Sequence, residues 1–373
     1  VWGSGIFLGL YIYNLISGLL LVDVSINLHE SSDCEVPSSF KDFVDTALKS
    51  EIAGTVMAGA SLLSNSCFLA FGTVHAGSLL ASTFPELGLE PIMGAGAFAA
   101  LLAVFSLTQT NTGLEKIANA AVMVLFSSFA SLLLPSMANV SDPMGTLLAP
   151  GTNADGFAAA AAAAVPLLLS SLTYQNIVPS ITKLLDFDRT KSTIAVAIGS
   201  FIPMAMYVAW CFADLGGGID SSTASGAGVA AFTAFSASAL FGSSIAAVMS
   251  LAEEYESIFS DMVEDDGSCP IKNKFSVPAV TASMVPPVAV ALAFSQGGQD
   301  MSCALHFNGA FITPFLYGLL PIILYQNIQQ KEDDGAGLIS LSSLPQVLLG
   351  AGTIGFLGQE IIQDITNLPN LMA

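Results

Sequence analysis

The sequence predicts an all-α polytopic membrane protein, and three observations support this fold class. The chain of 373 residues has a mean hydropathy of +0.71. Hydrophobic residues make up 53% of it and charged residues only 10%, a composition that does not fit a soluble globule. Apolar runs of membrane-spanning length, about 17–25 residues, recur along the whole chain. We therefore expect one transmembrane domain over residues 1–373.

Ten such runs can be delimited, and each is expected to form one membrane-spanning helix. They cover residues 1–22, 52–80, 91–109, 117–137, 156–182, 193–215, 227–252, 276–295, 303–326 and 338–363. The chain starts at Val1, inside the first run and without a methionine, so we expect an N-terminally truncated domain.

The basic residues predict the orientation of these spans. All nine Lys and Arg residues fall in loops on one side of the membrane under this assignment. These loops are 23–51, 110–116, 183–192, 253–275 and 327–337. Because Lys and Arg are enriched in cytoplasmic loops, we expect this side to be cytoplasmic, or stromal in a plastid envelope.

Charge and motif content exclude several function classes. A formal net charge of −20 argues against nucleic acid as a partner. The acidic segments 253–256 and 261–266 are expected to be solvated loops. The sequence has no GxxxxGK[ST] loop and no Cys/His cluster, so we expect no ATP drive, metal or other cofactor. The spans contain few ionisable side chains, which argues against an enzyme.

The fifth run is interrupted at mid-length by the polar segment Ser170-Ser171-Leu172-Thr173-Tyr174-Gln175-Asn176. Hydrocarbon cannot hydrogen-bond a freed backbone, so irregular polar chain at this depth must lie inside protein or beside water. Transporters place such interruptions where a solute binds, because unwound carbonyls and half-helix ends can act as ligands. A Pro-kinked helix whose Ser and Thr bond their own backbone is the alternative.

Two further features allow both a structural and a functional interpretation. The span 227–252 is rich in small and hydroxyl residues, which favour close helix packing. Its adjacent Ser243 and Ser244 would also suit a weak cation site of hydroxyls and carbonyls. Prolines in the spans 276–295 and 303–326 indicate either static kinks or hinges.

Several short motifs occur in a fixed order along the chain. They are the segment 171–181, which ends in Val178-Pro179-Ser180-Ile181, the segment 198–207 followed by Trp210, and the segments 76–82 and 286–292. In this order they resemble the tyrosine/tryptophan permease family of aromatic amino acid transporters, within the amino acid–polyamine–organocation superfamily. The similarity covers nearly the whole chain.

The resemblance implies a particular fold and an absent helix. In these transporters five helices are followed by five more in an inverted repeat, and the first and sixth helices are broken at mid-membrane. The segment 1–22 resembles the second helix of the family, so ten of about eleven spans would be present. The interrupted run 156–182 would be the broken sixth helix.

The resemblance also implies a substrate site. Ser170, Ser171 and Thr173 would meet the ammonium or carboxylate of an amino acid. Tyr174 and Gln175 would shape the side-chain pocket, with Asn176 in the same turn. Ser243 and Ser244 lie on what resembles the eighth helix, where related sodium-coupled transporters bind the ion.

These inferences predict a secondary active transporter that moves aromatic amino acids by alternating access. Its partners would be an amino acid, the lipid bilayer and a coupling cation, with H⁺ favoured over Na⁺ because the family is thought to use protons. Two alternatives remain open: a transporter of another neutral amino acid or small solute, and a truncated protein without transport activity. A channel is disfavoured, because its pore would need a continuous polar lining.

Overall fold

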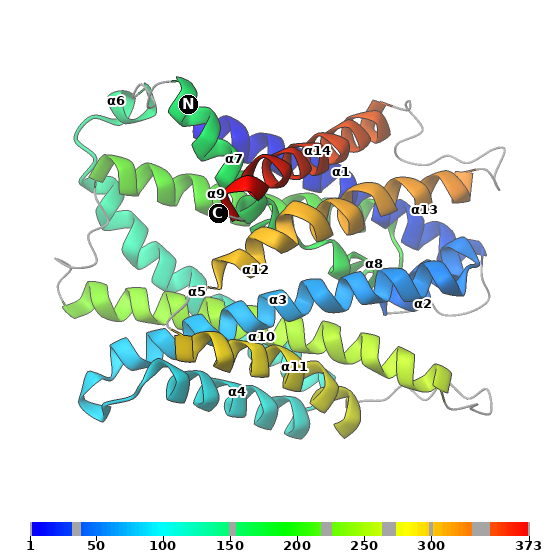
Figure 1. Ribbon diagram of the computed structural model, residues 1–373, viewed down its shortest axis with the longest axis horizontal. Helices are drawn as coiled ribbons and strands as arrows, with labels where there is room; N and C mark the ends of the chain where they lie inside the picture. The colour runs from blue at the N-terminus through cyan, green and yellow to red at the C-terminus, as the bar shows by residue number, and fades with distance from the viewer. Residues whose placement is uncertain are drawn as a thin grey trace. The chain divides into compact units, whose positions relative to one another are not determined.

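A computed structural model describes residues 2–31, 39–148, 154–217, 226–262, 274–297, 301–329 and 344–371. Within these ranges the regular structure is helical and contains no strand (Figure 1). The elements are α1 (Trp2–Ser31), α2 (Phe40–Leu48), α3 (Glu51–Thr83), η1 (Pro85–Leu87), α4 (Pro91–Thr108), α5 (Asn111–Ala138), α6 (Pro143–Leu148), α7 (Ala154–Ser171), η2 (Gln175–Ile177), α8 (Val178–Leu184), α9 (Arg189–Gly217), α10 (Gly226–Met262), α11 (Val277–Gly297), α12 (Ser302–Phe307), η3 (Asn308–Ile312), η4 (Pro314–Leu319), α13 (Leu320–Gln329) and α14 (Leu344–Leu371).

Among the described residues, eight helical stretches are long and apolar enough to cross a membrane. They are α1, α3, α4, α5, α9, α10, α11 and the continuous stretch from α12 to α13. The predicted runs 156–182 and 338–363 correspond to the α7–α8 pair and to α14, and residues 338–343 lie outside the described ranges. The all-α polytopic class is therefore confirmed.

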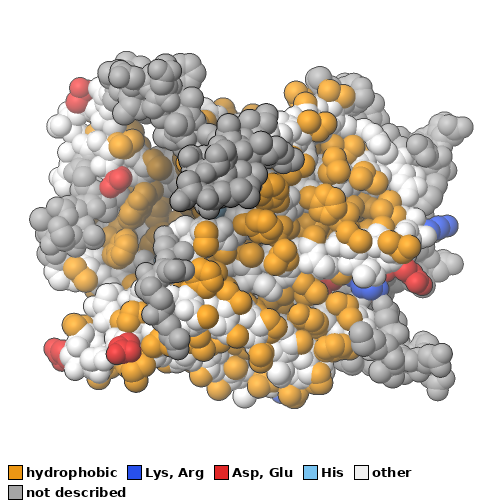
Figure 2. Space-filling model, in the orientation of Figure 1, with side chains coloured by type: hydrophobic (Ala, Val, Ile, Leu, Met, Phe, Trp, Pro, Cys, Tyr) orange, Lys and Arg blue, Asp and Glu red, His pale blue; other side chains and the backbone are white. Residues whose placement is uncertain are grey.

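The exposed side chains are those of a membrane protein. Large apolar residues in the middle of helices are open to the surroundings, such as Met123, Leu134 and Ile354, each with about 70% of its surface exposed. On the face drawn in Figure 2, hydrophobic side chains cover the helices, and charged side chains lie toward the edges. Lipid solvates such a surface, whereas water would not.

The chain divides into two compact units. Unit 1 consists of Val1–Ser61, Gly151–Met206 and Leu305–Ala373, and unit 2 consists of Leu62–Pro150 and Tyr207–Ala304. The boundaries fall inside α3, α9 and α12. Each unit has its own buried apolar core.

In unit 1, α1 lies at the centre of the core. It contacts α13, α14, α7 and α8, while α7 contacts η3. Leu20 and Leu21 of α1 are fully buried together with Tyr317 and Leu324. Helices that surround α1 thus bury its middle, which places polar residues of α1 inside protein.

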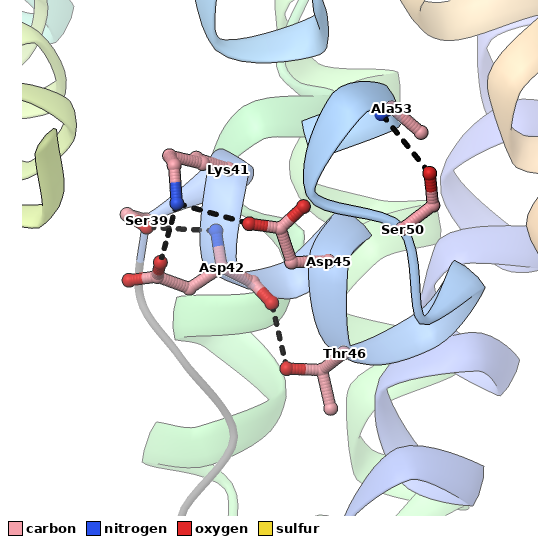
Figure 3. Close-up of polar contacts among 7 residues, drawn as sticks. All are labelled: Ser39, Lys41, Asp42, Asp45, Thr46, Ser50 and Ala53. Atoms are coloured by element: carbon pink, nitrogen blue, oxygen red, sulfur yellow. Dashed lines mark hydrogen bonds and ion pairs between the residues drawn. The ribbon is translucent and has the colours of Figure 1, made fainter. Parts of the chain in front are cut away.

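The predicted loop 23–51 is wrong in part, because it contains helical structure. Helix α1 continues to Ser31, and α2 follows as a short amphipathic helix. Phe40, Phe43, Val44 and Ala47 are buried at the helical spacing that forms one apolar face. Lys41, which is also buried, pairs with both acidic residues of α2, and Ser39 caps the helix (Figure 3).

In unit 2, long helices pack closely through small residues. Helix α10 contacts α5 and α11, and α11 contacts α4. A Cβ atom on Gly94 would lie 2.6 Å from the carbonyl oxygen of Gly77, so only glycine lets α3 and α4 approach this closely. Trp210 stacks on Phe235 with ring centroids 5.9 Å apart, and Phe129 lies against both rings.

Unit 2 also contains an open apolar groove of about 720 Å³. Residues of α3, α4, α5 and α10 line it, and Ser238 contributes the one hydroxyl among them. That hydroxyl donates to the carbonyl oxygen of Ala234 at 2.7 Å. The groove therefore offers a ligand almost no free polar group.

The acidic segment 253–256 was expected to be a solvated loop, and this expectation is wrong. Helix α10 continues through it to Met262, and Glu254 is only 2% exposed. The side-chain oxygen of Glu256 accepts a hydrogen bond from the backbone N–H of Ser276. The helix extends because the preceding apolar face continues in register, with Leu251 and Ala252 fully buried. Residues 263–266 of the second acidic segment lie outside the described ranges.

Candidate functional site

The predicted interruption of the fifth run is present in unit 1. Helix α7 ends at Ser171, and the chain is irregular over residues 172–174 before η2 and α8 follow. The last helical turn closes with bonds from the Leu172 N–H to Leu168 and from the Thr173 N–H to Ser170. Tyr174, with φ −145° and ψ 0°, then takes the chain out of the helical path. Figure 1 shows α7 and α8 as separate segments.

Gln175 is the buried centre of the interruption. Its side chain is fully inaccessible, and its Nε2 donates to the side-chain oxygen of Asn14 on α1 at 2.6 Å. Its Oε1 accepts the backbone N–H of Tyr174 at 2.9 Å. Asn14 is held by its own Nδ2, which donates to the carbonyl oxygen of Leu10 at 3.0 Å. One amide thus satisfies the freed backbone and ties it to α1.

Tyr174 makes a second connection to α1. Its hydroxyl donates to the carbonyl oxygen of Asn14 at 3.0 Å. The ring lies against Gly18, where an added Cβ atom would be 2.6 Å from the tyrosine hydroxyl. Gly18 therefore leaves the space that the Tyr174 ring occupies, and the interruption is fastened to α1 over more than one helical turn.

Ser170 connects the end of α7 to the segment η3. Asn308, the first residue of the π-helical segment η3, donates from Nδ2 to the Ser170 hydroxyl at 2.8 Å. Both side chains are buried. A side chain on Gly309 would overlap the carbonyl oxygen of Pro166. The backbones of η3 and α7 are therefore in direct contact beside this hydrogen bond.

The other predicted site residues bond mainly to their own segment. The Ser171 hydroxyl is exposed and donates to the carbonyl oxygen of Leu167 at 2.8 Å. The Thr173 hydroxyl donates to the carbonyl oxygen of Ser170. Asn176 is half-buried in η2. The alternative of back-bonding thus describes Ser171 and Thr173, whereas Ser170, Tyr174 and Gln175 bond to other helices.

The two serines of the weak cation site lie on α10 in unit 2. Ser243 is exposed and donates to the carbonyl oxygen of Leu240 at 3.2 Å. Ser244 is buried, and its hydroxyl has no hydrogen-bond partner among the described residues. An added Cβ atom on Gly72 would lie 2.7 Å from the Ser244 oxygen. Close packing against α3 is therefore evident at Ser244.

Sequence reasoning missed Asn14 and Asn308, which hold the interruption from two other helices. Each is an amide inside an otherwise apolar run. That isolation is the signal that could have found them, because polar groups at this depth need a partner. In the part of the chain that the structure describes, no group of three or more His, Cys, Asp or Glu side chains could hold a metal. The site is built from neutral oxygen and nitrogen atoms.

A charged cluster joins α1 to the start of α9. Asp23 is buried, and its carboxylate lies 3.6 Å from Nη1 of Arg189. Nη2 of Arg189 donates to the side-chain oxygen of Asn27 at 3.4 Å. In the preceding turn Asp188 caps α9, and the backbone N–H of Lys191 lowers the pKa of its carboxyl.

Comparison with known proteins adds an independent result. Residues 1–226 match the sequence model described as the Tryptophan/tyrosine permease family. This match includes α7, the interruption, α8 and all of α9. No curated protein matches the chain.

Proposed function

The chain belongs to the tryptophan/tyrosine permease family, and on this basis we propose that it carries aromatic amino acids across a membrane by coupling to a proton gradient. The family and the apolar helices support an integral multi-pass membrane protein that transports amino acids rather than an enzyme. Aromatic substrates, the coupling cation and alternating access are the finer parts of the proposal. The inverted repeat of five plus five helices belongs to it as well.

The single observation that supports this function best is the polar interruption of α7. Two buried amides, Asn14 and Asn308, meet the interruption from α1 and η3. The C-terminal end of α7 carries the negative end of the helix dipole, which suits an ammonium group or another cation. Ser170, Ser171, Thr173, Tyr174, Gln175 and Asn176 form the proposed substrate site.

Alternating access requires the site to open to one side at a time, with bound ligand shifting the populations. The hydrogen bonds from Tyr174 and Gln175 to Asn14 hold the interruption against α1. A substrate that competes for Asn14 would release these bonds. In our proposal this exchange frees α8 to move, and the basic loops face the cytoplasm or stroma.

Uptake in proteoliposomes tests the proposed function. The full-length protein is reconstituted, and uptake of radiolabelled tyrosine and tryptophan is measured with an inward proton gradient, a sodium gradient or neither. We expect proton-driven uptake that Gln175→Ala and Thr173→Ala reduce. Ser250→Ala on α10 is the control, because Ser250 accepts a hydrogen bond from Asn65 of the same unit and lies outside the proposed site.

Three results would contradict parts of the proposal. Driven uptake of other neutral amino acids alone would reject the aromatic assignment. Sodium-driven uptake would reject the proton. No uptake of any amino acid by correctly inserted protein would favour a membrane protein without transport activity.

A further inference from the structure

Asn308 has a buried oxygen that the observed contacts leave unused. Its side chain is fully buried, and its Nδ2 donates to the hydroxyls of Ser170 at 2.8 Å and Thr313 at 3.4 Å. Its Oδ1 accepts no hydrogen bond from any described residue. A buried polar atom without a partner costs about 1–3 kcal/mol, so its presence calls for an explanation.

The backbone around Asn308 is unusual in the same place. Asn308 begins η3, and η3 and η4 are both π-helical, a form that is rare and concentrates at functional sites. Glycine at 309 lets this backbone reach the carbonyl oxygen of Pro166 on α7. The amide is therefore presented to the last turns of α7 by an irregular segment rather than by a regular helix.

We propose that the amide oxygen of Asn308 is a ligand for a positively charged group at the interruption of α7. The group is the ammonium of the amino acid or, where the coupling ion is Na⁺ rather than H⁺, that ion, because an amide oxygen does not take up a proton at physiological pH. This inference rests on the transport function proposed above. Asn308 would bind through Oδ1 while Nδ2 keeps its bond to Ser170.

The chemistry of the surroundings selects a cation over an anion. An amide oxygen accepts hydrogen bonds or coordinates cations and cannot donate to a carboxylate. The bond to Ser170 places Asn308 at the C-terminal end of α7, whose dipole is negative there. The polar contacts of Asn308 are all with neutral groups, so a bound cation would meet no competing positive charge in them.

Two variants of the full-length protein test this role against a matched control. Asn308→Leu removes the ligand, and Asn308→Asp keeps an acceptor and adds a negative charge. Thr353→Val is the control, because it also removes a buried interhelical bond in unit 1, that of Tyr13 to Thr353 at 2.9 Å. Folding is checked by size-exclusion chromatography and thermal unfolding in detergent. If Asn308→Leu does not fold, Asn308→Ser replaces it.

Two titrations separate the sources of positive charge. Tyrosine binding is compared with binding of 3-(4-hydroxyphenyl)propionate, which lacks the amino group. If Asn308 binds the ammonium, Asn308→Leu weakens tyrosine binding by about 10-fold to 100-fold and leaves the analogue unchanged. If Asn308 binds a coupling Na⁺, the variant raises the half-saturating sodium concentration by a similar factor and affects both ligands equally. Asn308→Asp should lower that concentration.

A purely structural Asn308 would give a different result. Asn308→Leu would then behave like Thr353→Val, with a lower melting temperature and unchanged titrations, and the proposal would be overturned. If the wild type binds no aromatic amino acid, the transport proposal fails separately. Cation-dependent thermal stabilisation of the wild type that Asn308→Leu abolishes would still support the ligand role, and its absence would reject it.

Discussion

The two units of this protein differ in the hydrogen bonds that connect their helices. In unit 1 side chains bond between helices: Gln175 and Tyr174 to α1, Asn308 to α7, and Tyr13 to α14. In unit 2 many hydroxyls bond back to a carbonyl one turn earlier in their own helix, as Ser25 and Ser200 also do in unit 1. Examples are Thr73, Ser78, Ser128, Ser136, Ser238, Ser243, Thr281 and Ser283.

This difference follows from backbone geometry. A regular helix satisfies its own amides and carbonyls, so its hydroxyl side chains need no outside partner. The interruption of α7 frees backbone groups that only other helices can satisfy inside a membrane. Side chains of α1, α7 and η3 together form the hydrogen bonds that the interruption requires. Unit 1 thereby has the polar interior that a solute needs. The polar contacts of unit 1 should therefore matter more for stability and transport than those of unit 2.

The largest effect is expected at the charged link of unit 1. Arg189→Met removes a guanidinium from the buried carboxylate of Asp23, and breaking a buried pair in this way costs about 3–5 kcal/mol. The free energy of unfolding in detergent measures the loss. Lys191→Met is the control, since its pair with Asp188 is exposed and should contribute about 0–1 kcal/mol. Equal effects of the two variants would show that the Asp23 pair does not hold α1 to α9.

A steric change at η3 should have the next largest effect. Gly309→Ala places a methyl group on the carbonyl oxygen of Pro166, and overpacking of this kind costs about 1–3 kcal/mol. The upper end is expected because neither backbone can rotate away. Gly199→Ala on α9 is the control, because apart from the adjacent backbone of α9 no described atom lies within 4 Å of the added carbon. A thermal midpoint of Gly309→Ala at or above that of Gly199→Ala would contradict the close contact between α7 and η3.

The two units can be compared directly through one interhelical bond in each. Gln175→Leu removes the hydrogen bonds to the side-chain oxygen of Asn14 and from the N–H of Tyr174, which should cost about 2 kcal/mol. We also expect at least a tenfold loss of uptake, since about 1.4 kcal/mol corresponds to tenfold. Ser250→Ala removes the hydrogen bond from Asn65 to Ser250 in unit 2. This loss should lower the free energy of unfolding by about 0.6 kcal/mol. If Ser250→Ala lowers uptake as much as Gln175→Leu, the functional contrast between the units is wrong.

The sequence predicted the interruption itself because local composition determines it. A polar stretch of seven residues inside an apolar run cannot stay a regular, lipid-exposed helix. The partners of this stretch could not be predicted, because Asn14 and Asn308 are separated from it by well over a hundred residues. No local pattern indicates which distant amide will face a given turn.

Helix boundaries were harder to predict where charge and burial compete. The segment 253–256 looked like a loop because it is acidic, yet α10 buries Glu254 within the helix. In α2 the apolar spacing of Phe40, Phe43 and Val44 was a readable helical signal, which the surrounding polar residues concealed. Composition therefore predicted the membrane-spanning parts of the helices well, and the residues at which the helices begin and end poorly.

The smallest change in stability is expected for a variant in unit 2, at Ser244. Ser244→Ala removes a buried hydroxyl that has no partner in the described part of the chain, and it should leave stability unchanged or raise it by up to about 1 kcal/mol. Gly72→Ala alone should destabilise, because its methyl group would lie 2.7 Å from the Ser244 oxygen. The double variant should recover most of that loss, since residues in contact are not additive. A shifted half-saturating cation concentration in Ser244→Ala would instead identify Ser244 as an ion ligand, and the regular helices of unit 2 would then share in the function.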